Sequence, residues 1–534
     1  MATSETDIVI LGAGHNGLVC AFHLARAGLK VTVLERRHVV GGAAVTEEFH
    51  PGFRNSTASY TVSLLRPEII AEMELARHGL RIVERRMANF LPLPDGQYLA
   101  AGNGRTAAEV AKFSTPDAGR LAAYEDRLEV VAAVLRDLVL RAPPNVTEAG
   151  WRAALPELIE AGRLGRRLGS LDTTARRDVM DLFTKSAGDW LDGWFESDPI
   201  KALLGFDSVV GNYASPYTPG SAYVLLHHVF GEVNGRKGAW GHAIGGMGAI
   251  TQAMASACAE AGVTIRLDAP VAEVLTANGR AVGAVTEAGD IVRARAVVSN
   301  LHPRLLFAKV DPAVVPADFS ERMGRYASGS GTFRMNVALS ELPRFTSLPE
   351  VGDHLTAGII IAPSLGYMDR AHAQARLDGW SREPIVEMLI PSTLDDTLAP
   401  PGRHVASLFC QHVAPVLPNG LAWENCRESV ADLMIETVDR YAPGFKASVI
   451  GRLALGPTDL EERFGLVGGD IFHGRLTLDQ LFSARPMLGH GDYRMPVPGL
   501  YLCGSGAHPG GGVTGAPGRN AAMAVLADRR RRRF

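Results

Sequence analysis

The chain has 534 residues, of which 46% are hydrophobic and 21% are charged, with a formal net charge of -3 at pH 7. This length predicts two or three globular domains with substantial cores. The small net charge gives no positive field that would gather nucleic acid, so that class of partner is excluded.

The five cysteines lie at wide spacings, at Cys20, Cys258, Cys410, Cys426 and Cys503. Because they form no CxxC pair and no cluster with histidine, the sequence predicts no metal site and no disulfide framework. Reduced thiols fit a cytoplasmic protein. No secretory leader is expected before a first strand near Asp7, and apolar runs such as "LEVVAAVLRDLVL" are too short to span a bilayer.

The first chemically informative stretch is "DIVILGAGHNGLVCAFHLARAGLKVTVLER", residues 7–36. A short apolar strand is followed by Gly12, Gly14 and Gly17 in a G-x-G-x-x-G pattern, then by a helical pattern and a second strand that ends at Glu35. The first glycine permits the turn, the second lets the backbone approach a pyrophosphate, and the third allows close packing of helix on strand. The stretch therefore predicts a dinucleotide site.

Glu35 follows Gly17 by 18 residues, which is the distance at which an acid accepts hydrogen bonds from a ribose. The alternative, a glycine turn made only for packing, does not explain why strand, helix, second strand and acid all fall in register. The pattern does not choose between FAD and NAD.

Four further stretches resemble a known protein family, and this resemblance favours FAD over NAD. They are "RRHVVGGAAVTEEFHPGFRNSTASYTV" after Glu35, "GGMGAI" from Gly245, "GGDIFHGRLTLDQLFSARP" from Gly468 and "GLYLCGSGAHPGGGVTGAPGRNAAMAVLAD" from Gly499. Together they make the whole chain similar to the phytoene desaturase-like FAD-dependent oxidoreductases. Within these, the chain most resembles the group of pyridine nucleotide-disulfide oxidoreductase domain-containing protein 2.

The resemblance implies one bound FAD. The implied cofactor-binding residues are Gly12, Ala13, Gly14, His15, Asn16, Gly17, Glu35, Arg36, Gly41, Gly42, Ala43, Ala44, Val271, Gly504, Ser505, Gly512 and Val513. Ser505 stands where many flavoproteins of the wider superfamily have an aspartate for the ribityl chain, and its hydroxyl can still form a hydrogen bond there.

Since the cofactor-binding stretches lie at both ends of the chain, we predict an α/β protein with a discontinuous Rossmann-like FAD-binding domain of residues 1–70, 240–305 and 490–534. The middle piece is expected to contain a three-stranded meander with turns at Asn278-Gly279 and Gly289-Asp290. Residues 71–239 and 306–489 are expected to form a mixed α+β substrate domain with a helical cap. "RTAAEVAKF" and "DRLEVVAAVLRDLVL" are expected as helices, and "TFRMNVALS", "PIVEMLIPS" and "HVASLFCQHV" as strands.

Five side chains fall in segments that the family places near the flavin. His473 and Tyr60 are the candidate catalytic acid or base, whereas Trp240, Arg485 and His508 are candidate substrate-contacting residues. Each has a structural alternative: a satisfied hydrogen bond for His473 and Tyr60, a cavity wall for Trp240, and shaping of the cofactor loop for His508. The pair His227-His228 lies in an apolar run and is expected in a core or facing a cavity.

The sequence thus favours a flavoenzyme acting on carbon-carbon bonds of an apolar, polyene or isoprenoid-like substrate, by desaturation, saturation or isomerisation. Two alternatives stay open, a flavin amine oxidase and a catalytically silent FAD-bound scaffold. NAD(P)H is expected to be a poor reductant, because only one nucleotide fingerprint has its full context.

Peripheral contact with a membrane is also expected, because such substrates partition into lipid. The candidate entry surface is "SPYTPGSAYVLLHHVF", for which ordinary core is the alternative. Arg529 to Arg533 form a basic tail that anionic lipid would attract. The sequence leaves the oligomeric state open.

Overall fold

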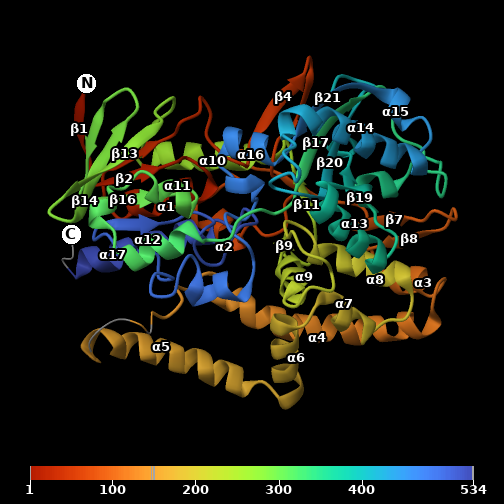
Figure 1. Cartoon of the computed structure of the whole chain (residues 1–534), viewed down its shortest axis with the longest axis horizontal. Helices are drawn as coiled ribbons and strands as arrows, with labels where there is room; N and C mark the ends of the chain where they lie inside the picture. Colours follow the sequence, from red (N-terminus) through yellow and green to blue (C-terminus); the bar gives the residue numbers. More distant parts are fainter. Residues whose placement is uncertain (1, 146, 148–150, 532–534) are drawn as a thin grey trace.

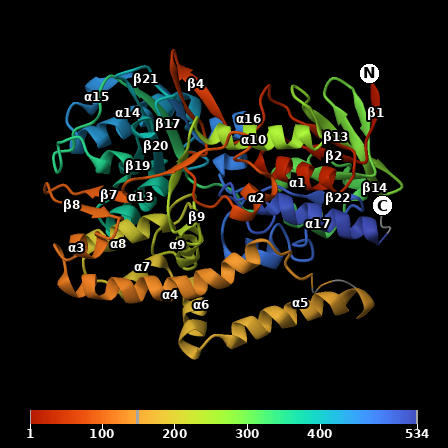
Figure 2. The ribbon, with the colours of Figure 1, turned by 180° about the vertical axis from the view of Figure 1, so that it is seen from behind.

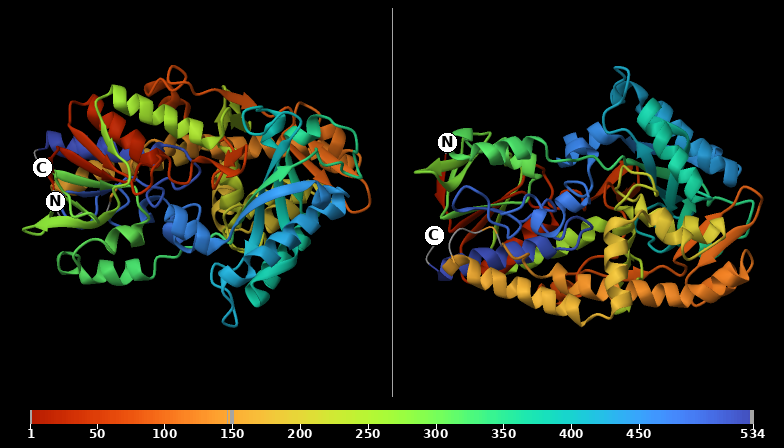
Figure 3. Two further views of the ribbon diagram at one scale, coloured as in Figure 1. Left: turned by 90° about the horizontal axis from the view of Figure 1, so that it is seen from above. Right: turned by 60° about the horizontal axis from the view of Figure 1, so that its bottom comes forward.

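The computed structural model describes residues 2–145, 147 and 151–531. These residues form two lobes, each built on a sheet, with a layer of helices along one side of both (Figure 1). Figure 3 shows the lobes side by side, and Figure 2 shows β1 and α17 at the same end of the molecule.

The first lobe contains a parallel five-stranded sheet. Its strands, in spatial order, are β12 (Thr264–Arg266), β3 (Val31–Leu34), β2 (Ile8–Leu11), β16 (Ala296–Ser299) and β22 (Leu500–Leu502). All four pairings are parallel. β2, β3, β16 and β22 are buried along their whole length, as expected of strands covered on both faces. One sheet therefore combines the beginning, the middle and the end of the chain.

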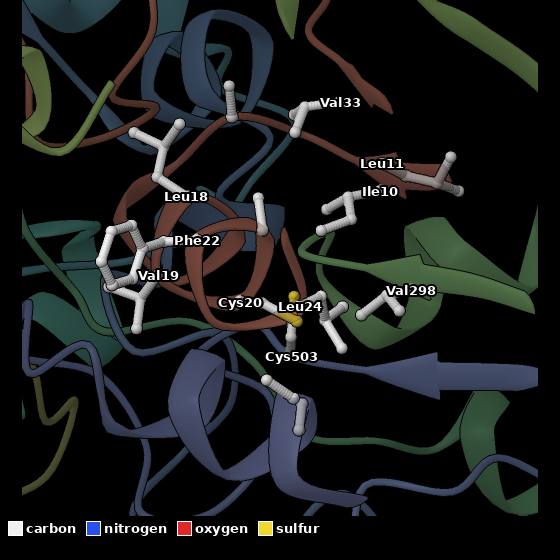
Figure 4. Close-up of a cluster of buried hydrophobic side chains, with 14 of the residues drawn as sticks. Ile10, Leu11, Leu18, Val19, Cys20, Phe22, Leu24, Val33, Val298 and Cys503 are labelled. Carbon is white, nitrogen blue, oxygen red and sulfur yellow. The ribbon is translucent and has the colours of Figure 1, made fainter. Parts of the chain in front are cut away.

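Three helices cover one face of this sheet. They are α1 (His15–Arg26), α10 (Met247–Glu260) and α17 (Ala516–Arg530). Leu18 and Phe22, one turn apart on α1, pack in the core with Ile10 of β2 (Figure 4). Cys20 and Cys503 lie in the same core, and burial raises the pKa of the Cys20 thiol, which makes it unreactive.

A second sheet lies beside the first and is mostly antiparallel. Its order is β1 (Thr3–Glu5), β15 (Ile291–Arg293), β14 (Arg280–Thr286) and β13 (Val271–Ala277). The expected meander is present, and positive φ angles at Asn278 and Gly279 make its first turn. β1 was not expected from the sequence, because its exposed polar residues form a strand only by pairing with β15.

The second lobe is built on a seven-stranded sheet. Its order is β21 (Val449–Leu455), β17 (Phe333–Leu339), β20 (His404–Val413), β19 (Trp380–Leu389), β18 (Gly358–Ile361), β7 (Asn89–Pro92) and β8 (Tyr98–Ala101). The three strands expected from the sequence are β17, β19 and β20. Only the pairing of β18 with β7 is parallel, so the fold is α/β with mixed sheets. Two helices, α13 (Leu365–Asp378) and α14 (Trp423–Tyr441), accompany this sheet.

The helical layer comes from one stretch of the chain. It consists of α3 (Thr106–Val110), α4 (Thr115–Val139), α5 (Trp151–Ser170), α6 (Thr173–Thr184), α7 (Ala187–Asp192), α8 (Asp198–Gly205) and α9 (Ser221–Val229). Among the described residues, no helix is both long and apolar enough to cross a bilayer.

Short strands and helices complete the two lobes. The strands are β4 (Thr46–His50), β5 (Phe53–Ser56), β6 (Ile82–Glu84), β9 (Glu232–Val233), β10 (Arg236–Lys237) and β11 (Gly241–Ala243). The helices are α2 (Pro67–Glu72), α11 (Pro303–Phe307), α12 (Ala317–Gly324), α15 (Phe445–Ser448) and α16 (Pro457–Phe464).

Candidate functional site

One continuous cavity of about 340 Å³ connects the two lobes. One part is lined by Gly12, Gly14, Glu35, Gly41 and Val271 of the parallel-sheet lobe, and another by Tyr60, Val210, Trp240, Phe409 and Phe472. Since ligands of parallel α/β sheets bind at the carboxyl ends of the strands, the first part lies where a dinucleotide is expected. The second part is walled mainly by apolar and aromatic side chains, which suits an apolar ligand.

The glycine turn between β2 and α1 leaves no room for side chains. A Cβ at Gly14 would lie 2.5 Å from the Asn300 side-chain nitrogen, and one at Gly17 would lie 2.2 Å from the Gly12 carbonyl oxygen. Gly12 has a φ of +94°, which favours glycine. The backbone of this turn therefore forms part of the cavity wall directly, as a phosphate-binding turn must.

Glu35 lies at the end of β3 and is buried. Its carboxylate accepts hydrogen bonds from the backbone N–H of Ala13 (2.7 Å) and of Arg37 (3.0 Å). These bonds fix the carboxylate beside the glycine turn, and its remaining lone pairs can accept from ribose hydroxyls. Arg36 also lines the cavity, and its guanidinium donates to the Glu462 carbonyl at 2.8 Å.

The second glycine pair closes the other side of the turn. The Gly41 N–H donates to the Ala13 carbonyl oxygen at 2.9 Å, which joins this loop to the fingerprint. A Cβ at Gly41 would lie 2.5 Å from the Ala44 carbonyl oxygen, and φ at this residue is +123°. Gly41, Gly42 and Ala43 line the cavity, whereas Ala44 supports the loop by accepting from Thr251 at 2.9 Å.

The C-terminal arm enters the cavity through Ser505, Gly512 and Val513. The Ser505 hydroxyl accepts from the Asn16 side-chain amide at 3.3 Å, which ties the arm to the start of α1. Val513 has a φ of +57°, and such a conformation is strained for a β-branched residue. Strain of this kind is concentrated at ligand sites, because the surrounding structure holds it in place.

Several expected cofactor residues support the cavity without lining it. Ala13, Asn16, Gly17, Ala44 and Gly504 are of this kind, whereas Gly12, Gly14, His15, Glu35, Arg36, Gly41, Gly42, Ala43, Val271, Ser505, Gly512 and Val513 line it. The sequence did not point to Asn300, His302, Phe464 and Lys309, which line it as well. Asn300 directly follows β16, so its position at the carboxyl edge of the sheet was the available signal.

His15 and His473 bring two unpartnered ring nitrogens to the cavity. His15 Nε2 and His473 Nδ1 are buried without a hydrogen-bond partner. Burial lowers the pKa of His15 to about 4 and that of His473 to about 3, so both rings are neutral at pH 7. Unpartnered buried nitrogens beside a cavity indicate that a polar ligand completes them.

Tyr60 lines the cavity, but its hydroxyl bonds to a residue outside the lining. The hydroxyl donates to the carboxylate of Glu387 on β19, and the ring stacks on Phe409 with centroids 4.8 Å apart. Burial, together with Glu387, raises the pKa of Tyr60 well above its ordinary value. Tyr60 is therefore a hydrogen-bond donor and not a proton acceptor.

Charged groups behind Tyr60 form a network that sequence reasoning missed. The guanidinium of Arg334 lies 4.7 Å from the centre of the Tyr60 ring and donates to the Leu408 carbonyl at 2.9 Å. Burial raises the pKa of Glu387, and burial together with Glu387 raises that of Asp207 to about 8. A single charged residue within each of the mainly apolar strands "TFRMNVALS" and "PIVEMLIPS" was the available signal.

Two of the expected substrate residues lie outside the cavity lining. Arg485 is fully buried, and its guanidinium donates to the Ser505 carbonyl (2.8 Å) and to the Gln480 carbonyl (3.1 Å). His508 Nε2 lies 3.0 Å from the Leu138 carbonyl. Both side chains hold backbone in place, so they shape the site from outside the cavity lining. Trp240, in contrast, forms part of the wall.

The segment expected as an apolar entry surface is mainly core. Tyr223, Val224, Leu225, Leu226 and Phe230 are buried, Tyr213 is half-buried, and Tyr217 is exposed. His227 and His228 are buried as well, and His228 faces the cavity. No cluster of three or more metal-binding side chains occurs in residues 2–145, 147 and 151–531.

Fold and site together define a dinucleotide-binding α/β protein whose cofactor cleft opens into an apolar chamber. The model of the family "Flavin containing amine oxidoreductase" matches residues 17–332. This is more than half of the chain, which therefore belongs to this family of flavin-containing oxidoreductases.

Named relatives cover almost the whole chain. The "Pyridine nucleotide-disulfide oxidoreductase domain-containing protein 2" of Rattus norvegicus is 42% identical over 98% of this chain and 94% of its own length. A limonene dehydrogenase component of Castellaniella defragrans is 25% identical, over 98% of this chain and 95% of its own. "Phytoene desaturase (neurosporene-forming)" of Cereibacter sphaeroides is 24% identical, again over 98% and 95%. The resemblance inferred from the sequence is confirmed.

A solved structure shares the fold. An oxidoreductase from Methanosarcina mazei superimposes with a TM-score of 0.62 at 18% identity, covering 98% of this chain and 100% of the other. At this identity the likeness concerns the fold alone.

Proposed function

We propose that the protein binds one FAD non-covalently and oxidises, reduces or isomerises carbon-carbon bonds of an apolar, polyene or isoprenoid-like substrate. The observation that carries this proposal is the continuity of the cavity, which runs from the glycine turn at Gly14 to a chamber walled by Tyr60, Trp240 and Phe409. A cofactor in the first part and an apolar substrate in the second would meet inside a single cavity.

The residues fit FAD at each end of the cleft. Backbone without side chains at Gly14 and Gly41 suits a pyrophosphate, and the fixed carboxylate of Glu35 suits a ribose. Bound FAD would supply the acceptor or donor of a hydride. The aromatic wall of this chain would orient the substrate and exclude water, and the neutral ring of His473 would offer its unpartnered Nδ1 to the bound ligand as a hydrogen-bonding group. The bond to Glu387 would hold the Tyr60 ring in place, and the ring would help to position the substrate.

The names of two relatives support the substrate class. Limonene and phytoene, which appear in those names, are both isoprenoid hydrocarbons without charged groups. Burial of such a molecule is favoured by the apolar chamber, at about 25 cal/mol for each Å² removed from water.

One observation favours amine oxidation as a second candidate. The carboxyl group of Glu387 is hydrogen-bonded to the lining residue Tyr60 and could attract a cationic amine. The family model also carries amine oxidoreductase in its name. Glu387 does not line the cavity, however, and Tyr60 does, so the apolar substrate is preferred.

The test begins with purified protein. Acid precipitation should release all the yellow colour as FAD, in a ratio of one to one with protein, and colour on the pellet would contradict non-covalent binding. Solvent extraction followed by mass spectrometry should reveal a co-purified polyene or isoprenoid. An amine as the only bound organic molecule would favour the second candidate.

We also propose a peripheral contact with anionic membranes, made by α5. Leu155, Leu158 and Ile159 lie on one face of this helix with 50%, 56% and 49% of their surface exposed. The same helix carries Arg166, whose charge is complementary to anionic lipid, and Arg163, which is ion-paired with Glu160. α5 lies at the edge of the helical layer, away from both sheets (Figures 1 and 2).

A further inference from the structure

Two arginine side chains contact the aromatic wall of the chamber from outside its lining. The guanidinium carbon of Arg334, on β17, lies 4.7 Å from the ring centre of Tyr60 and 5.8 Å from that of Phe409. The guanidinium carbon of Arg85 lies 5.4 Å from the ring centre of Trp240. All three rings line the cavity, and neither arginine does. Each guanidinium thus contacts a ring of the chamber wall without entering the chamber.

Arg334 is a buried charge without an acidic partner. Only 1% of its surface is exposed, and its guanidinium donates to the Leu408 carbonyl oxygen and to the Ser407 hydroxyl, both at 2.9 Å. Among residues 2–145, 147 and 151–531 it forms no ion pair with a carboxylate. Burial lowers the pKa of Arg334 to about 10, so the group is still charged at pH 7. Such a charge is costly to bury, and in a wall of low dielectric its field is only weakly screened.

The acidic groups nearby do not cancel both arginines. Glu387 accepts the hydrogen bond of the Tyr60 hydroxyl. It also borders Arg85, because a Cβ at Gly358 would lie 2.9 Å from Glu387 Oε1 and 3.1 Å from Arg85 Nη1. Burial, together with Glu387, raises the pKa of Asp207 to about 8, so Asp207 is neutral at pH 7. Two guanidinium groups therefore face at most one carboxylate, which leaves this part of the wall with a net positive charge.

Other charges do not reverse this sign. The two acids that line the cavity are Glu35 and Glu287, and both lie in its cofactor part. At Phe472, the guanidinium of Arg485 donates to the backbone carbonyl at 2.6 Å, and the carboxyl group of Asp470 accepts from the backbone N–H at 2.8 Å. Since these two groups have opposite charges, they compensate each other. The unbalanced charge of the chamber wall is thus the one behind Tyr60 and Phe409.

We propose that Arg334 is a specificity-determining residue whose charge makes the chamber reject cationic ligands. The apolar substrate then carries no charge or a negative one, and no ammonium group. This inference rests on the proposed function, since it narrows the substrate class of the same chamber. Apolar surroundings alone penalise charges of either sign, so a preference between an anion and a cation of equal size must come from fixed charges.

Three isoprenoid probes with the same carbon skeleton test this proposal on the FAD-loaded protein. At neutral pH geranate is an anion, geranylamine is a cation, and geraniol is uncharged. Dissociation constants are measured by isothermal titration calorimetry, without turnover. We expect geranate to bind at least about tenfold more tightly than geranylamine, whereas an apolar chamber without a fixed charge would bind them about equally.

Variants of opposite effect assign the preference to Arg334. R334M removes the guanidinium but keeps a long apolar side chain, so the ratio of the two dissociation constants should fall toward one. E387Q removes the compensating acid, so the ratio should rise. R334K keeps the charge and should keep the preference for the anion. The matched control is R325M, at an arginine with a 77% exposed side chain beside α12, which should leave the ratio unchanged.

Geraniol reports whether each variant keeps an intact chamber, and its affinity should change by less than about threefold. Opposite shifts of the ratio in R334M and E387Q support the proposal, because a general loss of structure would weaken geraniol in both. Equal binding of geranate and geranylamine by the unmodified protein overturns the role of Arg334 but leaves the apolar substrate class in place.

An unchanged ratio in an R334M protein that still binds geraniol also overturns the role of Arg334. If R334M no longer binds geraniol, E387Q decides, and an unchanged ratio there overturns the inference. Failure of all three probes to bind the unmodified protein overturns the proposed function, and this inference with it.

Discussion

The hydroxyl of Tyr60 donates a hydrogen bond to the carboxylate of Glu387, a residue 327 positions later in the chain. This bond joins the cofactor-proximal loop to the central strand β19 of the other lobe. Arg334 lies over the face of the same tyrosine, 4.7 Å from the ring centre. A side chain that the sequence suggested for proton transfer is thus part of a buried charge network between the lobes.

Replacing Tyr60 by phenylalanine should destabilise the protein. Glu387 would lose a donor inside a buried site, which costs about 1–3 kcal/mol in the free energy of unfolding. Urea denaturation of Y60F measures this change, and Y98F, at a partly exposed tyrosine, is the control. A double-mutant cycle with E387Q should give a coupling energy of about 1 kcal/mol or more. A coupling near zero would show that the bond contributes nothing.

The substitution G14V should abolish FAD binding. Side-chain atoms would fill the turn and approach the Asn300 amide, where the built Cβ already lies 2.5 Å away. We expect at least a tenfold loss of bound flavin, measured as the absorbance ratio at about 450 and 280 nm. The matched control is G165V, since a Cβ at Gly165 meets nothing within 4 Å. Circular dichroism must show both variants folded, and full flavin in G14V would refute the assignment of the turn.

NAD(P)H should reduce the bound flavin poorly. Among the residues that the structure describes, only the stretch from Gly12 to Glu35 combines the glycine turn with a following strand and acid, and this is the proposed FAD site. Under anaerobic conditions, NADH should leave the flavin absorbance largely unchanged for minutes, while dithionite bleaches it as the control. Bleaching by NADH within seconds would reveal a second nucleotide site.

The unfolding free energy should fall steeply as the pH drops below about 6.5. Burial lowers the pKa of His15, His228 and His508 to about 4, and of His412 and His473 to about 3. Between those values and the ordinary 6.5, the unfolded chain binds more protons than the folded one. Stability is therefore complete above pH 6.5 and decreases toward pH 4, by up to about 1.4 kcal/mol per pH unit for each histidine.

Thermal unfolding from pH 8 to pH 5 checks this dependence. The variant H412Q removes one of these groups at a position outside the cavity lining, so the slope of stability against pH should decrease by about one proton. An unfolding temperature that stays constant from pH 7 to pH 5 would contradict the burial of these rings.

Replacing the exposed apolar face of α5 should abolish binding to anionic vesicles. The triple variant L155D/L158D/I159D removes the apolar contact and adds negative charge, so flotation with phosphatidylserine-containing liposomes at low salt should be lost. L377D, at a leucine 72% exposed on α13, is the control and should still float. A truncated variant that lacks residues 529–534 tests the basic tail. Arg532 and Arg533 of this tail lie outside the described residues.

Flotation results separate the sources of attraction. If the unmodified protein does not float, the membrane contact is wrong. If the α5 variant floats and the truncated protein does not, the tail makes the contact through charge alone, and α5 is excluded.

The sequence determined the cofactor cleft because its signals are local. Gly12, Gly14 and Gly17 are each required by the steric constraints of one turn. The strand before them and the acid after them belong to the same βαβ unit. The meander and the strands β17, β19 and β20 were predictable for the same reason, because hydrophobic runs and turn residues are read over a few positions.

The tertiary structure alone decided which of the candidate residues line the cavity. Arg485 and His508 are of the same residue types as side chains that line the cavity. Instead they bind backbone carbonyl oxygens, because buried carbonyls in the surrounding loops require hydrogen-bond donors. Tyr60 contacts Glu387 only when distant segments fold together. The same is true of Ser63, which contacts Gly231, three residues after His228. Sequence patterns do not encode such pairings, since contacts between distant residues depend on how the two lobes pack.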